Sequence, residues 1–397
     1  MTNPEVIIIG SGPSGLMAAQ RLAEKGVTVH IYEQNKAAAR KFLVAGHGGF
    51  NITHSQDIEK FILNYDKKFI QHIVQQFNNS QTILWLKSIG IPTYIGSSGK
   101  IFPQKNIKPI DVLNAWLNKL QNLGVVIHYG YEFIDFNHHE ITLKHASDHI
   151  ILKYNKLIFA LGGASWKKTG STATWKDIFD KKDIKLIPFS AANSGYETEI
   201  DFSEIQGQVL KNIEVSFNDI KKKGELVFTS YGIEGSAIYY LNRFTRKHTF
   251  PQTINIDLKP NKKNEEILEL LYTARKTTEV LKQKLKLNKA ALFLLKKINK
   301  DAYNTPTELI KYIKSFPIII HNFRPINEVI STAGGLSLDE LNNDLSLKKY
   351  PSVYCIGEML DWEAPTGGYL LQACFSMGVY CAENLYKLHA NKLLPNK

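Results

Sequence analysis

The chain is poor in cysteine. Its 397 residues include three cysteines and no Cys-x-x-Cys pair, which excludes a disulfide framework and a dithiol redox centre. Cys374 and Cys381 are separated by two turns of a predicted helix, about 10 Å, which is too far for a disulfide. This cysteine usage is typical of the reducing cytoplasm, where we expect the protein to reside.

Long apolar runs are missing as well. Although 44% of the residues are hydrophobic, no run approaches the roughly 18 residues of a membrane helix. The first predicted strand begins at Val6, so we expect no signal peptide and no membrane partner. The length and composition predict a soluble globular protein of two or three domains.

Acidic residues are the smaller charged class. The chain has 49 Lys and Arg against 37 Asp and Glu, a formal net charge of +12. Many lysines stand beside Asn and Ile, which favours solvated faces. The alternative is a basic surface for an anionic substrate or a nucleic acid. Lysines without interleaved arginines and aromatics are a weak nucleic-acid signal, so we do not expect nucleic acid as the main partner.

The most specific pattern stands at the start of the chain. An apolar run, residues 6–9, enters the turn Gly10-x-Gly12-x-x-Gly15, and an Ala-rich helix pattern follows. Gly10 permits the tight turn, Gly12 lets a pyrophosphate approach bare backbone, and Gly15 allows close packing of helix and strand. The next predicted strand ends on Glu33, where a carboxylate accepts from ribose hydroxyls and disfavours a 2′-phosphate. This order of elements predicts a dinucleotide-binding site.

A second glycine pattern lies near the other end of the chain. Residues 353–356 predict a buried strand that delivers Gly357 and Glu358 at its carboxyl end, where ligands bind in open α/β sheets. Residues 366–369 then lead into a helix that starts near Leu370. Its amino end would face the flavin edge where negative charge collects on reduction. The alternative is a Gly-rich helix cap.

The remaining pattern predicts an α/β protein with an insertion. We expect an FAD-binding domain split into residues 1–195 and 318–397, an inserted β module at 196–261 and an inserted helical subdomain at 262–317. The other predicted elements are helices over 57–89, 110–123 and 370–388, an antiparallel meander over 125–153, and a buried strand over 157–160.

With these motifs the chain resembles the YhiN/BaiN-like family of bacterial FAD-dependent oxidoreductases. The matching segments are 10–15, Glu33, 40–42, 45–54, 99–103, 160–165, 224–229, 331–335, 357–361 and 367–369. The resemblance implies a glutathione-reductase-like Rossmann FAD domain that carries an inserted β-barrel with a helical extension. Gly49 and Phe50 replace an Arg-Cys pair and His54 replaces an Asn, which indicates the sub-branch with an Ala-Gly-x-Gly-Gly-x-Asn-x-Thr-His motif.

Motifs and resemblance together predict the site residues. The expected cofactor-binding residues are Gly10, Gly12, Pro13, Ser14, Gly15, Glu33, Gln34, Arg40, Lys41, Gly46, Gly48, Asn51, Thr53, Ala160, Gly162, Gly163, Gly357, Glu358, Asp361, Gly367, Gly368, Tyr369 and Leu370. Lys41 is expected to pair with the pyrophosphate or with the polar edge of the flavin. The candidate catalytic residues are His47 as a proton relay, and Tyr231 and Tyr369 on the substrate face. No metal site is predicted.

The predicted function is an FAD-dependent oxidoreductase. Hydride would pass between flavin N5 and a small organic substrate held between the FAD domain and the insert. No second Gly-x-Gly-x-x-Gly follows a strand, so either NAD(P)H binds transiently as reductant or the substrate itself reduces the flavin. The sequence leaves both the reductase and the oxidase direction open. Two alternatives stay open, a non-catalytic flavin-binding redox sensor and an RNA-directed flavoenzyme.

Overall fold

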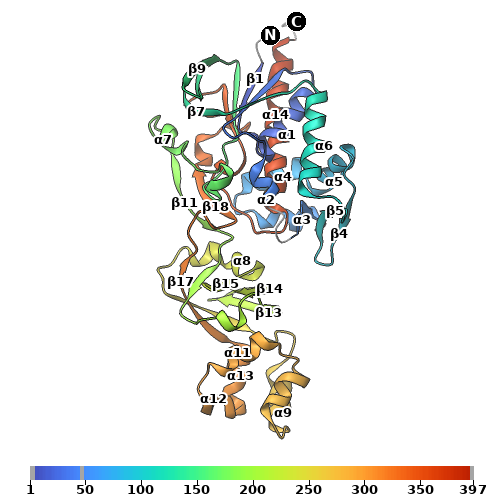
Figure 1. The fold of residues 1–397 in the computed structure, drawn as a ribbon, viewed down its shortest axis with the longest axis vertical. Coiled ribbons are helices and arrows are strands. Elements are labelled where there is room, and N and C mark those ends of the chain that lie inside the picture. Colours follow the sequence, from blue (N-terminus) through green and yellow to red (C-terminus); the bar gives the residue numbers. More distant parts are fainter. Residues whose placement is uncertain (1–4, 45–48, 394–397) are drawn as a thin grey trace. The chain divides into compact units, whose positions relative to one another are not determined.

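The computed structural model describes residues 5–44 and 49–393, with side chains to residue 388. The chain forms two compact units (Figure 1). Unit 1 comprises Met1–Ser190 and Thr332–Lys397, and unit 2 comprises Ala191–Ser331. Within the part of the chain that the structure describes, none of the helices combines the length and the apolar character that crossing a bilayer requires.

Unit 1 is built on a five-stranded parallel sheet. Its strand order is β19 (Val353–Cys355), β10 (Lys156–Phe159), β1 (Val6–Ile9), β2 (Val29–Glu33) and β6 (Val126–Tyr129). Ile8 is paired with Ile158 on one side and with Ile31 on the other. All three side chains are fully buried, because a parallel sheet is covered on both faces. Burial on both faces explains why these strands are continuous apolar runs in the sequence.

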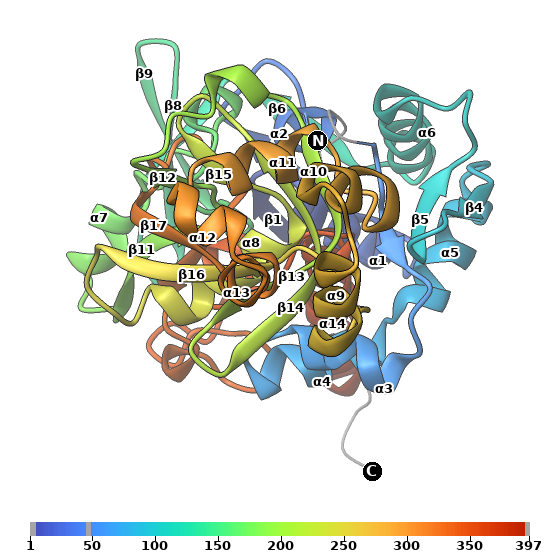
Figure 2. The same cartoon turned by 90° about the horizontal axis from the view of Figure 1, so that it is seen from below.

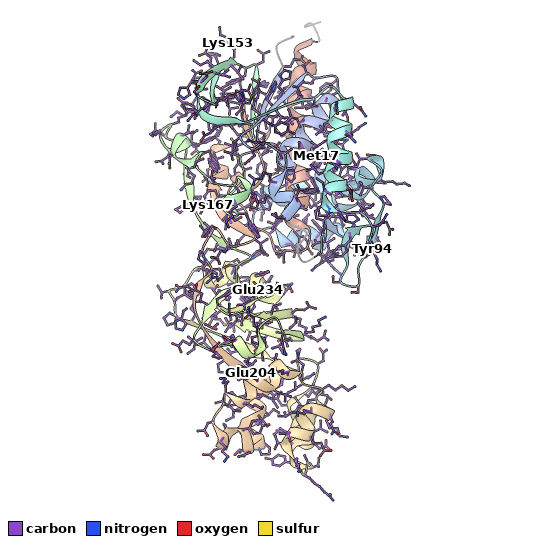
Figure 3. All side chains as sticks on the ribbon, in the orientation of Figure 1. Met17, Tyr94, Lys153, Lys167, Glu204 and Glu234 are labelled. Carbon is purple, nitrogen blue, oxygen red and sulfur yellow. The ribbon has the colours of Figure 1, made fainter. Side chains whose placement is uncertain are left out.

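Two long helices of unit 1 pack tightly against each other. They are α1 (Pro13–Ala23) and α14 (Tyr369–Leu393). A Cβ atom on Gly378 would lie 2.6 Å from the carbonyl oxygen of Ser14, so glycine is required for this close approach. Met17 of α1, labelled in Figure 3, is fully buried in the same core. Unit 1 also contains the helical elements α2 (Arg40–Val44), α6 (Pro109–Asn122), η2 (Lys167–Thr169), α7 (Lys176–Asp180), η5 (Leu338–Glu340) and η6 (Gly357–Met359).

The region predicted to be helical, residues 57–89, is helical but is not one continuous helix. The structure has α3 (Ile58–Phe61), η1 (Ile62–Asn64), α4 (Lys68–Gln76) and α5 (Asn79–Ser88) instead. The last break occurs because Asn78 starts a new helix with a capping box, in which its side chain accepts from Gln81 N–H and the Gln81 side chain accepts from Asn78 N–H. A three-stranded sheet of β3 (Thr53–His54), β5 (Lys100–Pro103) and β4 (Thr93–Ile95) lies in the same part of the sequence.

The predicted meander is three-stranded. It contains β7 (Tyr131–Phe136), β8 (Glu140–His145) and β9 (Asp148–Lys153), all antiparallel. Its expected first strand, β6, instead pairs in parallel with β2 and forms the edge of the main sheet. Gly130, at φ +80°, lies between β6 of the main sheet and β7 of the meander.

Unit 2 contains a closed six-stranded barrel. Its order is β12 (Tyr196–Thr198), β15 (Gly232–Glu234), β14 (Ile220–Phe228), β13 (Val209–Phe217), β16 (Gln252–Asp257) and β17 (Phe316–Phe323). β17 pairs with β16 and β12, so residues 318–331, expected in the FAD domain, lie in unit 2. The chain returns to unit 1 within β18 (Ser331–Leu336), which pairs with β11 (Leu186–Ala192).

The helices of unit 2 share one core with the barrel. α8 (Ser236–Thr245) packs against β13, β14 and β15. Figure 2 gives a view of these elements from below. The later helical elements are α9 (Asn264–Tyr272), α10 (Thr277–Glu279), the π-helical η4 (Val280–Lys284), α11 (Lys289–Lys296), α12 (Lys300–Asn304) and α13 (Pro306–Lys314). Ile267, Leu294 and Ile313 from these helices are fully buried in the same cluster as the barrel residues Ile254 and Ile318.

Candidate dinucleotide-binding site

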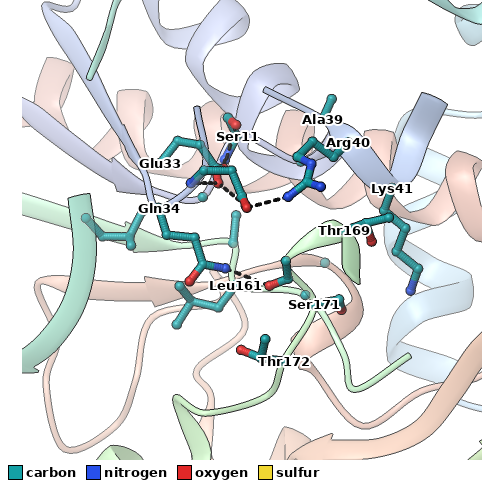
Figure 4. Close-up of a pocket in the computed structure, with 18 of the residues that line it drawn as sticks. Ser11, Glu33, Gln34, Ala39, Arg40, Lys41, Leu161, Thr169, Ser171 and Thr172 are labelled. Atoms are coloured by element: carbon teal, nitrogen blue, oxygen red, sulfur yellow. Dashed lines mark hydrogen bonds between the residues drawn. The ribbon is translucent and has the colours of Figure 1, made fainter. Parts of the chain in front are cut away.

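A pocket of unit 1 lies at the carboxyl ends of β1, β2, β10 and β19. It has an empty volume of about 1010 Å³, including its opening to solvent. Figure 4 shows the side chains that surround it. The predicted cofactor residues that line it are Gly10, Gly12, Pro13, Ser14, Glu33, Gln34, Arg40, Lys41, Ala160, Gly162, Gly357 and Glu358. Ligands of open α/β sheets bind at this edge.

The three glycines of the first turn act differently. A Cβ on Gly10 would lie 2.4 Å from the carbonyl oxygen of Ala160, and one on Gly15 would lie 2.2 Å from the carbonyl oxygen of Gly10. Both glycines are therefore needed for packing. A Cβ on Gly12 would meet no atom within 4 Å. Gly12 leaves open space in the pocket at the amino end of α1, where backbone N–H groups and the helix dipole favour an anion. This cradle fits a pyrophosphate.

Glu33 ties the end of β2 to that turn. One carboxylate oxygen accepts from Ser11 N–H at 3.0 Å and from Ser11 Oγ–H at 2.6 Å. The other accepts from Asn35 N–H at 2.8 Å and from Asn35 Nδ2–H at 2.7 Å. These four bonds fill the acceptor positions of a carboxylate. A ribose hydroxyl would therefore take the place of one of the two side-chain donors.

Arg40 and Gln34 extend this network across the pocket (Figure 4). Arg40 Nη1 donates to Asn35 Oδ1 at 2.7 Å, and Gln34 Nε2 donates to the carbonyl oxygen of Gly170 at 2.6 Å. Asn35 therefore links the Arg40 guanidinium to the Glu33 carboxylate, and these two charged groups form no direct ion pair. Arg40 and Glu33 thus place a cation and a carboxylate near each other in the pocket lining.

Lys41 lies on the other side of the turn. Its Nζ donates to Glu358 Oε2 at 2.7 Å and to Ser165 Oγ at 2.7 Å. Gly357, at φ +85°, brings this strand end against α1, because its Cβ would lie 2.6 Å from Ser14 Oγ. The structure pairs Lys41 with a carboxylate of the protein. Its predicted pairing with a pyrophosphate or a flavin edge stays a prediction.

The second glycine pattern is closely packed. A Cβ on Gly368, at φ +98°, would lie 2.5 Å from Thr53 Cα. Thr53 Oγ1 donates to Gln372 Oε1 at 2.8 Å. The Tyr369 hydroxyl donates to Gln56 Oε1 at 3.0 Å, and burial raises the pKa of Tyr369 to about 12. Tyr369 therefore holds its proton at neutral pH, and its catalytic role stays a prediction.

Several predicted residues do not line the described pocket. Those are Gly15, Asn51, Thr53, Gly163, Asp361, Gly367, Gly368, Tyr369 and Leu370. Asp361 forms an ion pair with Lys67 at 2.9 Å. The buried Asn51 Nδ2 has no hydrogen-bond partner among the described residues, so it offers a free donor to a bound group. Gly46, His47 and Gly48 lie outside the described residues.

Tyr231 lies in unit 2. Its hydroxyl donates to Glu234 Oε2 at 2.6 Å, and the Arg324 guanidinium stacks 4.3 Å from its ring centroid. Burial, followed by the hydrogen bond and charge of Glu234, raises the pKa of Tyr231. Arg324 is itself paired with Glu197 at 2.6 Å. The catalytic role of Tyr231 stays a prediction.

Sequence reasoning missed other residues that line the pocket. They include Asn35, Tyr131, Phe133, Thr169, Gly170, Ser171, Thr172, Thr174, Trp175 and Cys374. The run of Ser and Thr after the Gly162-Gly163 pair was a usable signal, because small hydroxyl residues beside a nucleotide turn supply donors. Among the described residues, no three His, Cys, Asp or Glu side chains are grouped as a metal would require.

The fold and this pocket define an oxidoreductase of the FAD-dependent class. The chain belongs to the HI0933-like family, whose Rossmann-domain model it matches over residues 4–384. The resemblance to the YhiN/BaiN-like family is confirmed by this match. The predicted α/β class and Rossmann FAD-binding domain are confirmed as well, and the strand pairing of unit 2 confirms the predicted barrel.

Curated relatives align over nearly the whole chain. The chain is 24% identical to the ribosomal RNA dihydrouridine synthase of Haemophilus influenzae, covering 95% of this chain and 97% of the relative. It is 23% identical to the 3-dehydro-bile acid delta(4,6)-reductase of Clostridium scindens, covering 94% and 96%. The Escherichia coli ribosomal RNA dihydrouridine synthase is 20% identical over 96% and 98%.

Solved structures share the fold at low identity. An open flavocytochrome c3 fumarate reductase matches with a TM-score of 0.55 and 13% identity, covering 97% of this chain and 78% of that chain. A 3-ketosteroid-delta4-(5alpha)-dehydrogenase from Rhodococcus jostii matches with a TM-score of 0.51 and 14% identity, covering 96% and 97%. At such identity these matches concern architecture alone.

Proposed function

We propose that the chain reduces a carbon–carbon double bond of an organic substrate with FAD as its cofactor. The observation that carries the proposal is the open cradle at Gly12, beside the amino end of α1 and the Glu33 carboxylate. FAD supplies hydride chemistry when bound. The names of two relatives support reduction, since one makes dihydrouridine and the other is a delta(4,6)-reductase.

Residues of this chain have distinct tasks in the proposal. The free N–H groups at the start of α1 bind the pyrophosphate, with Gly12 leaving the room. Glu33 and Asn35 orient the adenosine ribose, and Arg40 neutralises nearby negative charge. The buried Asn51 amide offers a donor to a polar edge of the cofactor. NAD(P)H serves as a transient reductant, because the sequence offers no second dinucleotide turn.

The test combines a cofactor assay and a turnover assay. Purified protein should carry a yellow cofactor whose extract contains adenine, or should take up added FAD. Under anaerobic conditions NADH or NADPH should bleach the flavin band, and a conjugated enone should restore it. A protein that stays colourless after FAD titration contradicts the proposal. A flavin that is never reoxidised by any unsaturated acceptor indicates the redox-sensor alternative.

A second candidate function is reduction of a base in RNA. Two relatives are named as ribosomal RNA dihydrouridine synthases. The net charge of +12 agrees with an anionic partner. In unit 2, Lys222 Nζ lies 4.5 Å and Arg243 Cζ 5.6 Å from the centroid of the Tyr240 ring. Burial and the Arg243 charge lower the pKa of Lys222. Cations that flank an aromatic ring suit nucleic acid.

Salt dependence separates the two substrate classes. If RNA is the substrate, its binding should weaken steeply between low and physiological salt, and Lys222→Gln with Arg243→Gln should reduce the salt slope. Reduction of a small enone should not respond to these two substitutions. If RNA binding does not depend on salt, the surface of Lys222, Tyr240 and Arg243 is not the RNA-binding site.

A further inference from the structure

One wall of the pocket is a loop with a distinctive backbone. We call residues 166–175 the cover loop. It begins at Trp166, a non-glycine residue at φ +58°, and contains Ala173 at φ +56° and Gly170 at φ +104°. Side chains other than glycine avoid the left-handed region, and strained positions of this kind occur at ligand clamps. The backbone of the loop is therefore held by its surroundings.

The cover loop is fixed to the rest of unit 1 at its carboxyl half. The Ser171 hydroxyl donates to the carbonyl oxygen of Gly163 at 2.7 Å. The indole N–H of Trp175 donates to the carbonyl oxygen of Gly162 at 3.1 Å. Trp175 is also buried against Phe179 and Phe189. These contacts anchor the loop to the strand end after β10.

A side-chain bond from outside the loop holds its tip. Gln34 Nε2 donates to the carbonyl oxygen of Gly170 at 2.6 Å, across the pocket from the strand end of β10. A Cβ on Gly170 would lie 2.4 Å from Asn35 Nδ2, the same amide that donates to Glu33. The loop tip therefore contacts the ribose side of the pocket through the residues that follow β2.

Hydroxyl-bearing residues of the loop line the pocket. Thr169, Ser171 and Thr172 are drawn at its edge in Figure 4 and line it, whereas Lys167 and Lys168 are exposed. The Thr169 hydroxyl donates to the carbonyl oxygen of Trp166 at 2.7 Å, and the Thr172 hydroxyl lies 3.1 Å from that of Thr174. Lone pairs of these oxygens remain to accept from ribose hydroxyls. A dinucleotide in the pocket would thus lie beneath the tip of the loop.

We propose that the cover loop opens and closes over the adenosine–pyrophosphate half of the dinucleotide, with the Gln34–Gly170 bond as its latch. The inference rests on the proposed FAD cofactor. The loop turns about Trp166 and its anchored carboxyl half, and the latch keeps it closed. When it is closed, Thr169 and Thr172 add hydroxyl contacts to the cofactor. Gln34 is a positioning residue that controls entry and exit of the cofactor.

The first test needs no cofactor. Trypsin should cut the apoprotein slowly after Lys167 and Lys168, and Gln34→Ala should accelerate these cuts about tenfold, the factor expected for loss of one hydrogen bond. Gln104→Ala changes an exposed glutamine elsewhere in unit 1 and should leave the cuts unchanged. If Gln34→Ala does not alter cleavage at these lysines, the latch is refuted whether or not FAD binds.

The second test measures FAD kinetics by flavin fluorescence. A latch predicts that Gln34→Ala accelerates both association and dissociation of FAD. If Gln34 only contacts the cofactor, dissociation accelerates and association and cleavage stay unchanged, which overturns the latch. Thr172→Val, which keeps the side-chain shape, should accelerate dissociation alone. None of these readouts uses substrate turnover, so a protein that binds FAD but fails to reduce enones would refute the proposed reaction and leave the cover loop standing.

Discussion

The two glycine turns of unit 1 use the same residue for opposite purposes. At Gly12 the backbone is extended, with φ −73°, and a side chain would enter open space in the pocket. At Gly368 the backbone is left-handed, with φ +98°, and a side chain would collide with Thr53. The first glycine makes room for a ligand, and the second makes room for the protein. Spacing in the sequence does not distinguish the two.

The largest effect is expected at Gly368. Gly368→Ala should lower the free energy of unfolding by roughly 2–4 kcal/mol, because it adds left-handed strain and an overlap with backbone that cannot move aside. Thermal and denaturant unfolding measure this loss. Gly12→Ala is the matched control and should unfold like the unaltered protein. Equal stabilities of the two variants would remove the proposed difference between the turns.

Gly12→Val tests the other half of the comparison. The variant should fold normally, since no described atom lies near its Cβ position. It should bind FAD roughly 10- to 100-fold more weakly, by analogy with the 1–3 kcal/mol cost of overfilling a closely packed space. Titration followed by flavin fluorescence measures the affinity. A variant that binds FAD as tightly as the unaltered protein would place the pyrophosphate elsewhere.

Substitutions of Glu33 test whether its carboxylate binds the cofactor or only holds the turn together. Glu33→Ala should weaken FAD binding by about 1–3 kcal/mol and also lower the melting temperature, because Ser11 and Asn35 lose their acceptor. Glu33→Gln keeps the shape and should restore most of the stability but less of the affinity. If both variants bind FAD normally, Glu33 serves only to close the turn.

Cys374 reports occupancy of the pocket. It lines the pocket, whereas Cys355 and Cys381 are buried, and burial raises the pKa of Cys374 to about 12. Since the thiolate is the reactive form, labelling by a maleimide should be slow at pH 7 and accelerate about tenfold per pH unit. Bound FAD should suppress it. Labelling that is indifferent to FAD would mean that the cofactor does not cover this part of α14.

The smallest effect concerns His54, beside the second turn. Its Nδ1 accepts from Gln56 N–H at 3.0 Å, which requires the neutral ring, and burial lowers the pKa of His54 from 6.5. The unfolded chain therefore binds a proton first, so the stability present above pH 6.5 falls as the pH decreases through the native pKa. His54→Gln should reduce the loss of unfolding free energy below pH 6.5, as measured by denaturant unfolding at several pH values. His30 and His128, whose pKa values burial also lowers, would retain their share.

The sequence by itself determined the cofactor class and four of the five strands of the main sheet, all but β6. The apolar runs at 6–9 and 157–159, the glycine turn and Glu33 depend on local order along the chain. Strand, turn and helix N-terminus must follow one another in this way to present backbone N–H groups to phosphates, so the motif carries its own geometry.

Only the tertiary structure decided which groups meet across long sequence distances. The sequence pattern predicts that the strand at 318 belongs to the FAD-binding domain. In the structure this strand, β17, completes the barrel by pairing with β12 and β16. The bond of Gln34 to Gly170 and that of Lys41 to Glu358 join residues with no relation in spacing. The different tasks of Gly12 and Gly368 likewise depend on what lies opposite each backbone, which periodicity and propensity do not encode.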